Sequence, residues 1–343
     1  MSKAKLEILY CMILIILFSI LLSAQDSGGP EERTVSETGA KSGEVPTPPI
    51  TSHVNLVVVP VTVTDSYGKT VTVLKEDNFE VIDNKVPQEI KSFASEDAPA
   101  SVVLVFDNSG SMSGKIGRAK EAVAEFMKNS NPQDEFELIA FRNGRPMVVA
   151  PLTSKPEDIT DRIISDAGGG KTPLVDAIYL ALAEVKHKMT QPRKALLIIS
   201  DGGDNNSRYA WGELGKAVRE ADAQIYAIGV FEYSVFRSRT PEGDAWSFRF
   251  SAKTPEEAAG PFRLEELTGM SGGTMISAGN EKELPDIACR ISQRIRDQYV
   301  IAYKPSNLLA DGMWRKIKVK LKNLPKDLSF LSVSHKKGYY APH

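Results

Sequence analysis

The chain has 343 residues, of which 42% are hydrophobic and 25% are charged. Its 42 basic and 44 acidic side chains nearly cancel, so no overall basic charge favours nucleic acid as a partner. Four histidines are too few for a histidine-rich metal protein. This length is ample for a large hydrophobic core and favours two domains.

Residues 1–24 are typical of a signal peptide. Lys3 and Lys5 precede the uncharged run ILYCMILIILFSILLSA, whose small final residues predict cleavage after Ala24. A retained membrane anchor is the alternative, and in both cases we expect export to the periplasm, the envelope or the exterior. After cleavage Cys289 is the one remaining cysteine, so no intramolecular disulfide can form.

Residues 25–53 are rich in proline, glycine, serine, threonine and glutamate, a composition that predicts a disordered linker. Short β-branched runs follow in residues 54–97. We expect strands at VNLVVVPVTVTD, TVTVL, FEVI and QEIKSF, with DNK as a hairpin turn. Pro60, inside the first run, indicates a sheet edge or a bulge.

Residues 98–297 alternate between apolar runs and segments with helical periodicity. The expected strands are SVVLVFD, EFELIAF, PMVVAPL, KALLIISD, QIYAIGVF and GTMIS. The expected helices are KIGRAKEAVAEFMKN, KPEDITDRIISD, PLVDAIYLALAEVKHKM, WGELGKAVREAD, PFRLEELTGM and KELPDIACRISQRIRDQ. This alternation predicts a doubly wound α/β domain.

Residues 298–343 return to β-type runs, namely YVIAYKP, WRKIKVKL and SFLSVSH. Together with the runs in residues 54–97 they make about seven strands, and separate small β pieces would be hard to stabilise. The economical interpretation is one β-sandwich formed by the two flanking segments, with the α/β domain inserted into it.

Carboxylate and hydroxyl side chains follow the expected strands at their carboxyl ends, where open parallel sheets bind ligands. Asp107, Ser109 and Ser111 follow the run SVVLVF. Asp201 follows ALLIIS, and Thr172 stands at the start of a helix between them. These hard oxygen donors suit Mg²⁺, Ca²⁺ or Mn²⁺, whereas zinc and copper favour histidine and cysteine. Two carboxylates match the charge of one divalent cation.

The stretch SDAGGGKTPL also resembles the end of a phosphate-binding P-loop. Ser165 stands where that motif needs glycine, the preceding segment has a helical pattern, and Pro173 lacks an N–H group for a phosphate. Enzyme motifs are missing as well, because Ser109 and Ser111 lie in no Gly-x-Ser-x-Gly sequence and no histidine is placed to act as their base. We therefore expect no catalysis. Asp204 is expected to form local hydrogen bonds or cap a loop.

Taken together, the three motifs resemble the metal-ion-dependent adhesion site of von Willebrand factor A domains. DNSGSM matches the Asp-x-Ser-x-Ser motif, KTPLVDAI the threonine loop and ISDGGDN the third loop. The resemblance implies a Rossmann-like fold in which Ser109, Ser111 and Thr172 bind the cation directly. It also implies that Asp107 and Asp201 often act through water, and that the open coordination position accepts a carboxylate from a partner protein.

The flanking runs VPVTVTDSYGK, QYVIAYKP, WRKIKVKL and KKGYYAP resemble an exported bacterial subgroup of these proteins, often found in Acidobacteria, with an immunoglobulin-like sandwich. The resemblance implies an exported adhesion or protein-binding module that depends on a divalent metal and engages Asp or Glu of a partner. The alternative is a scaffold subunit of an envelope assembly, in which the metal only braces the loops. A membrane contact is expected only through an uncleaved N-terminal segment.

Residues 232–260 interrupt the α/β pattern. Arginine and aromatic residues are enriched at binding hot spots, and this segment contains Arg237, Arg239, Trp246, Phe248, Arg249 and Phe250. The segment is therefore a candidate for partner contact, and a long insertion that packs on its own domain is the alternative.

Overall fold

The structure is a computed structural model that describes residues 56–342, apart from 96, 166–168, 232, 241–242, 251, 253, 279–280, 326–327 and 329. The backbone alone is described for residues 164–165, 233–240, 243–250 and 281. The predicted signal peptide and linker lie outside the described residues. Among the helices that are described, none combines the length and the apolar character needed to cross a membrane.

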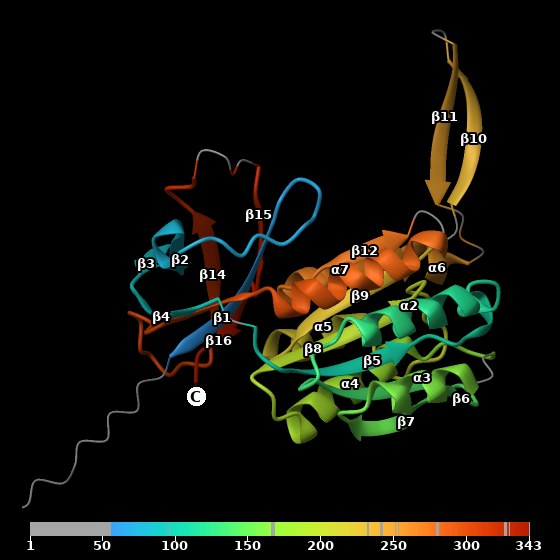
Figure 1. Ribbon diagram of the computed structural model, residues 1–343, viewed down its shortest axis with the longest axis horizontal. Coiled ribbons are helices and arrows are strands. Elements are labelled where there is room, and N and C mark those ends of the chain that lie inside the picture. Colours follow the sequence, from blue (N-terminus) through green and yellow to red (C-terminus); the bar gives the residue numbers. More distant parts are fainter. Residues whose placement is uncertain are drawn as a thin grey trace, which may run out of the picture. The chain divides into compact units, whose positions relative to one another are not determined.

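A six-stranded sheet with helices on both faces forms the α/β part (Figure 1). Its strand order is β12-β9-β8-β5-β6-β7, and all neighbours are parallel except β6 and β7. The strands are β5 (Ala100–Phe106), β6 (Glu135–Arg142), β7 (Arg145–Thr153), β8 (Arg193–Ser200), β9 (Gln224–Val230) and β12 (Met275–Ala278). The helices are α2 (Ile116–Lys128), α3 (Pro156–Ser165), α4 (Leu174–Lys188), α5 (Trp211–Glu220), α6 (Pro255–Ser271) and α7 (Leu284–Arg296), with the short 3₁₀ turns η2 (Gly110–Met112) and η3 (Glu281–Glu283).

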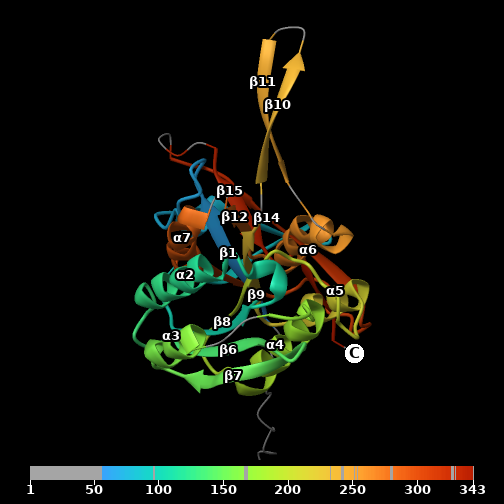
Figure 2. The ribbon, with the colours of Figure 1, turned by 90° about the vertical axis from the view of Figure 1, so that its right-hand side faces the viewer.

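Each face of this sheet has its own hydrophobic core, because successive side chains of a strand point to opposite faces. On β5, Val102 and Leu104 belong to the core that includes α2, α3 and α7, whereas Val103 belongs to the core with α4, α5 and α6. Figure 2 shows these two helix layers on either side of the sheet. The predicted doubly wound α/β domain is confirmed, and burial on both faces explains the continuous apolar strands.

Helix α6 begins earlier than the sequence predicted. The hydroxyl of Thr254 accepts a hydrogen bond from Glu257 N at 3.2 Å, and Pro255 occupies the first turn. Both features favour a helix start. Pro261, which the sequence placed at the beginning, therefore lies inside the helix.

Strands from the two flanking segments pair with one another in two four-stranded sheets, in the orders β15-β1-β13-β4 and β16-β14-β2-β3. The strands are β1 (Val57–Thr64), β2 (Phe79–Asp83), β3 (Val86–Gln88), β4 (Ile90–Ala94), β13 (Tyr299–Tyr303), β14 (Trp314–Leu321), β15 (Ser332–His335) and β16 (Gly338–Tyr340), with the 3₁₀ turn η1 (Glu76–Asn78) before β2. Strand β1 pairs with β13 and β15, and β2 pairs with β14. One hydrophobic cluster contains residues of both sheets, such as Val59 and Val319.

The first flanking segment differs from its prediction at two places. The run TVTVL forms no strand beyond an isolated bridge between Thr64 and Thr70. It is held instead by the Tyr299 hydroxyl, which donates to Val71 O at 2.7 Å and accepts from Leu74 N at 3.0 Å. The run QEIKSF divides, because β3 pairs with β2 whereas β4 joins the other sheet.

Pro60 lies at a local sheet edge, as predicted. Strand β13 pairs with β1 on one side at this position, and on the other side β15 begins to pair only at Val61. Because β15 does not pair with β1 at Pro60, the missing N–H group of this proline interrupts no inter-strand hydrogen bonds on that side.

Asp83 is a buried carboxylate that joins the two flanking sheets. Its Oδ2 accepts hydrogen bonds from the hydroxyls of Tyr303 at 3.0 Å and Tyr339 at 2.9 Å. We expect Asp83→Ala to lower the free energy of unfolding by about 2–4 kcal/mol, because the buried hydroxyl of Tyr303 and the half-buried hydroxyl of Tyr339 lose their acceptor. Glu80→Ala on the same strand removes only a partly exposed ion pair with Lys320 and should cost less than about 1 kcal/mol. Urea denaturation measures both, and equal losses would contradict this role of Asp83.

Candidate metal centre

Strands β5 and β8 are neighbours at the point where the chain order of the sheet reverses. From β5 the chain continues to β6 on one side, whereas β8 and β9 lie on the other. The loops that leave such a point diverge and form a crevice that binds ligands. The loop after β5 carries Asp107, Ser109 and Ser111, and the loop after β8 carries Asp201. Two of the three predicted loops therefore start at adjacent strand ends.

Asp107 is fully buried at the end of β5. Its Oδ1 accepts a hydrogen bond from Ser109 N at 3.0 Å, and its Oδ2 accepts one from the Ser200 hydroxyl at 2.5 Å. The pKa of Asp107 is raised to about 6, first by burial and then by the charge of Asp201, while the hydrogen bonds from Ser109 and Ser200 oppose the rise. The two carboxylates thus lie close enough to repel each other. A divalent cation bound between them would offset this repulsion.

The two serine hydroxyls of the first loop lie side by side. Ser109 Oγ and Ser111 Oγ are 3.2 Å apart. Adjacent oxygen ligands of an octahedral Mg²⁺ ion with bonds of about 2.1 Å lie about 3 Å from each other. Ser109 is buried and Ser111 is half-buried. Their spacing therefore fits two neighbouring ligands of one cation.

The glycines before Thr172 close the second loop onto the first. Gly169 N donates to Asn108 O at 2.6 Å, and Gly110 N donates to Gly170 O at 3.2 Å. Gly169 and Gly170 have φ angles of 135° and 94°, which residues other than glycine rarely adopt. These glycines therefore serve the turn that brings the two loops together.

The backbone of Thr172 is joined to the third loop by two hydrogen bonds with Asn205. Its N–H donates to Asn205 Oδ1 at 2.9 Å, and its carbonyl accepts from Asn205 N at 3.0 Å. The residue is 3% exposed, and within the part of the chain that the structure describes its hydroxyl has no hydrogen-bond partner. The hydroxyl is therefore available to a ligand.

Asp201 begins the third loop, and its Oδ1 accepts a hydrogen bond from Gly203 N at 3.0 Å. The side chain is nearly buried. Among the described residues no group of three or more His, Cys, Asp or Glu side chains could hold a metal ion. A cation at this crevice would therefore depend on the two carboxylates together with the hydroxyls.

The structure places Ser109 in contact with both Asp107 and Ser111, and Asp201 within electrostatic reach of Asp107. Thr172 is joined to both neighbouring loops through the backbone around it. All five predicted residues therefore belong to one set of interlocked loops.

Sequence reasoning missed the residues that hold these loops together. The Ser200 hydroxyl donates to Asp107 and accepts from Gly202 N at 2.9 Å, so it ties the third loop to the first. The Asn108 side chain exchanges two hydrogen bonds with the backbone of Phe141, at 3.1 and 3.0 Å. A polar residue at the very end of a buried apolar run was the available signal for Ser200.

Asp204 forms local hydrogen bonds, as predicted. Its Oδ1 accepts from Val175 N in the first turn of α4 at 3.2 Å and from the Ser207 hydroxyl at 2.5 Å. The carboxylate therefore caps a helix start, where negative charge is favourable.

The third loop packs directly on helix α6. A Cβ added to Gly202 would lie 2.6 Å from Gly260 Cα, so neither backbone leaves room for a side chain.

Helix α6 follows the antiparallel hairpin of β10 (Tyr233–Thr240) and β11 (Gly243–Phe250). The arginine and aromatic side chains proposed for partner contact in this hairpin lie outside the described residues.

The fold and the interlocked loops define an α/β domain with a candidate divalent-cation site at its switch point. Residues 102–203 match the family model of the von Willebrand factor type A domain. This stretch of the chain is therefore similar to von Willebrand factor type A domains, the family that its motifs resemble.

Relatives with curated descriptions are similar to part of the chain. Inter alpha-trypsin inhibitor, heavy chain 4, of Mus musculus is 30% identical over 159 residues, which cover 41% of this chain and 17% of that protein. Inter-alpha-trypsin inhibitor heavy chain H4 of Homo sapiens is 28% identical over 145 residues, which cover 38% of this chain and 15% of that protein. The matched stretch is thus less than a fifth of either relative.

Two solved structures are also similar to the chain. The von Willebrand factor type A protein of Catenulispora acidiphila has a TM-score of 0.46 at 13% identity, and the match covers 85% of this chain and 64% of that one. The protein BatB of Bacteroides thetaiotaomicron has a TM-score of 0.42 at 18% identity, and the match covers 57% and 98% of the two chains.

Proposed function

We propose that the protein is an exported binding module that uses a divalent cation to engage an Asp or Glu side chain of a partner protein. The observation that carries this proposal is that Ser109 contacts both Asp107 and Ser111 at a switch point that also holds Asp201. Ser109, Ser111 and Thr172 would contact the cation directly, and Asp107 and Asp201 would balance its charge, in part through water. A binding role without catalysis is proposed.

The donor set fits Mg²⁺, with Ca²⁺ or Mn²⁺ as alternatives, because every candidate ligand is a hard oxygen. Three hydroxyl ligands leave coordination positions for water or for an incoming carboxylate. The cation would supply a fixed positive charge to which a partner carboxylate binds. The match to the von Willebrand factor type A domain supports a role in protein interaction or adhesion.

A scaffold role, in which the cation only braces the loops, is the alternative. Hydrogen bonds already tie the loops together without an ion, through Ser200 with Asp107, Gly169 with Asn108, and Thr172 with Asn205. Bracing by a metal would therefore add little, which favours the binding role.

We also propose that residues 54–97 and 298–343 form one immunoglobulin-like β-sandwich into which the domain of residues 98–297 is inserted. The pairing of β1 with β13 and of β2 with β14 supports this arrangement. Residues 1–24 would direct export, residues 25–53 would act as a linker, and the protein would reach the periplasm, the envelope or the exterior. The resemblance to an exported bacterial subgroup supports this location.

Thr172→Ala is expected to weaken Mg²⁺ binding by about tenfold or more, because a neutral oxygen ligand is lost. Thr172→Ser is the matched control, since it keeps the hydroxyl and should bind Mg²⁺ within about threefold of the unchanged protein. Calorimetric titration of EDTA-treated, dialysed protein with MgCl₂ measures both affinities. Unchanged affinity in Thr172→Ala would remove Thr172 from the site.

The binding role is tested by capture from an envelope fraction in Mg²⁺ and in EDTA. A partner retained by Thr172→Ser in Mg²⁺, but lost in EDTA and in Thr172→Ala, supports the proposal. Stabilisation by Mg²⁺ without any EDTA-sensitive partner would favour the scaffold role.

A further inference from the structure

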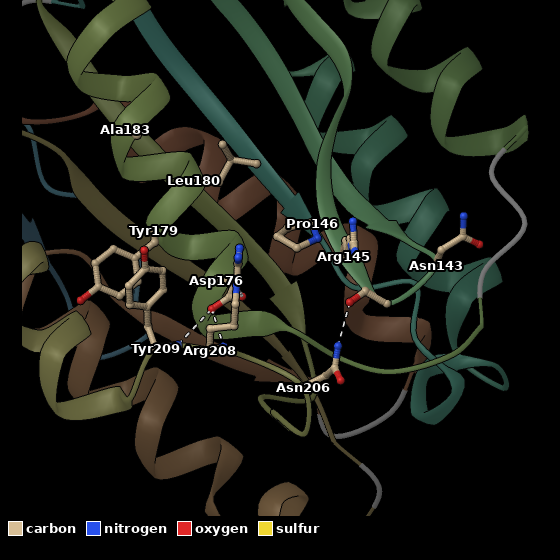
Figure 3. Close-up of a pocket in the computed structure, with 11 residues that line it drawn as sticks. Asn143, Arg145, Pro146, Asp176, Tyr179, Leu180, Ala183, Asn206, Arg208 and Tyr209 are labelled. Atoms are coloured by element: carbon tan, nitrogen blue, oxygen red, sulfur yellow. Dashed lines mark hydrogen bonds and ion pairs between the residues drawn. The ribbon is translucent and has the colours of Figure 1, made fainter.

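A pocket of about 850 Å³ lies beside the candidate metal centre. It is bounded by helix α4, by the turn between β6 and β7, and by the loop of residues 204–210. Figure 3 shows Asn143 and Arg145 on one side of this pocket and Asp176, Tyr179, Arg208 and Tyr209 on the other. The residues come from three separate segments of the chain.

The pocket carries more positive than negative charge. Arg208 Nε donates to Asp176 Oδ2 at 3.3 Å, and the Arg208 side chain is 86% exposed. Asp176 is buried, and its Oδ1 accepts from the backbone N–H groups of Arg208 at 2.9 Å and Tyr209 at 3.2 Å. Arg145 is exposed and, within the described part of the chain, forms no ion pair. The pocket is therefore lined by two guanidinium groups and by one carboxylate, which the loop backbone already holds.

The wall beside Arg208 is aromatic and apolar. The rings of Tyr179 and Tyr209 lie 4.5 Å apart, and Tyr209 is 50% exposed. Leu180 and Ala183 of α4 line the same pocket. Exposed tyrosine beside arginine is a combination that is enriched at binding hot spots. This wall can cover the aliphatic stem of a bound acidic side chain.

The pocket is continuous with the loops of the metal centre. Asn205 holds Thr172 by two hydrogen bonds, and the next residue, Asn206, donates from Nδ2 to Gly144 O in the pocket wall at 2.8 Å. A Cβ on Gly144 would lie 3.7 Å from Lys171 Cβ, so the residue before Thr172 borders the pocket as well. A ligand that reaches the cation can therefore extend along this wall.

We propose that this pocket binds a second acidic side chain of the partner segment whose first carboxylate coordinates the cation. The inference rests on the proposed function and defines the partner more closely, as an acidic peptide segment. Arg145 and Arg208 would bind the second carboxylate, since guanidinium groups pair with carboxylates through charge-assisted, often bidentate hydrogen bonds. Tyr179 and Tyr209 would pack against its stem.

The test uses two fluorescein-labelled hexapeptides, one of six glutamates and one of a single glutamate among glutamines, with fluorescence anisotropy in Mg²⁺ at 150 mM salt. Hexaglutamate should bind at least about tenfold more tightly than the single-glutamate peptide, because a second charged pair forms. Replacement of both arginines, Arg145→Gln with Arg208→Gln, should remove that advantage. It should leave the affinities for Mg²⁺ and for the single-glutamate peptide unchanged.

The matched control removes the same charge elsewhere, by Lys316→Gln with Lys318→Gln at exposed positions of β14. It should weaken hexaglutamate binding by less than about twofold at this ionic strength. Equal losses in both double variants would show general charge attraction and overturn the proposal. Arg145→Gln alone, at a residue without an ion pair in the described chain, keeps the test valid if the double variant fails to fold.

Failure of the proposed function has a separate signature. If calorimetry finds no Mg²⁺ binding to the unchanged protein, the metal site itself is wrong. If Mg²⁺ and the single-glutamate peptide bind but hexaglutamate has no advantage, the pocket proposal alone is wrong. Arginine-dependent hexaglutamate binding that persists fully in EDTA would also overturn it, because the two carboxylates would then not act together.

Discussion

Gly260→Ala is expected to lower the free energy of unfolding by about 3 kcal/mol, a large effect for one added methyl group. The Cβ would lie 3.1 Å from Gly202 Cα and closer still to the carbonyl oxygen of Asp201. These are backbone atoms, so no side chain can rotate away, and either α6 or the third loop must shift. A shift of the loop displaces Asp201, and we therefore expect weaker Mg²⁺ binding in the folded variant.

Gly269→Ala in the same helix is the matched control. A Cβ at Gly269 meets no atom within 4 Å, so alanine should raise the free energy of unfolding by about 0.5–1 kcal/mol through its better helix propensity. Urea denaturation of the two variants compares the same substitution in one helix with opposite expected signs. If both change stability in the same direction, α6 does not pack on the loop as closely as the structure shows.

Much of the α/β part could be predicted because its signals are local. Apolar strands such as SVVLVF differ in period from amphipathic helices such as α2, and neighbouring residues decide each element. The candidate ligands were found for the same reason, since Asp107, Ser109 and Ser111 stand together directly after a strand. The order of strands and helices alone was enough to place Asp201 and Thr172 at the same edge of the sheet.

The parts that were missed depend on contacts between distant segments. The run TVTVL has a strand-like sequence, but beyond its bridge to β1 its backbone bonds to the hydroxyl of Tyr299, which lies far along the chain. The start of α6 was hidden because Pro261 resembles a first-turn proline. Ser200 could not be linked to Asp107, nor Arg145 to Arg208, without the sheet order that brings their strands and loops together.

Asp107→Asn is expected to abolish stabilisation by Mg²⁺ and, at pH 8, to make the metal-free protein more stable. The buried carboxyl has a pKa raised to about 6, and its usual value is near 3.9. Because the folded state favours the protonated form, the stability that this group contributes is present below about pH 4 and is lost as the pH rises through 6. At pH 8 the loss amounts to about 3 kcal/mol. Asparagine avoids this loss, since its Oδ1 can still accept from Ser109 N and its Nδ2 can donate to the Ser200 hydroxyl.

Urea denaturation at pH 4 and pH 8, in EDTA or in MgCl₂, separates the two effects of Asp107→Asn. In EDTA, the stability of the variant relative to the unchanged protein should rise with pH. In MgCl₂ at a hundred times the dissociation constant, the unchanged protein should gain about 2.7 kcal/mol and the variant nothing. Asp204→Asn, at the carboxylate that caps α4, is the control and should keep the full gain from Mg²⁺. Two results would contradict this role of Asp107. One is that Mg²⁺ still stabilises Asp107→Asn, and the other is that the variant has a lower free energy of unfolding than the unchanged protein in EDTA at pH 8.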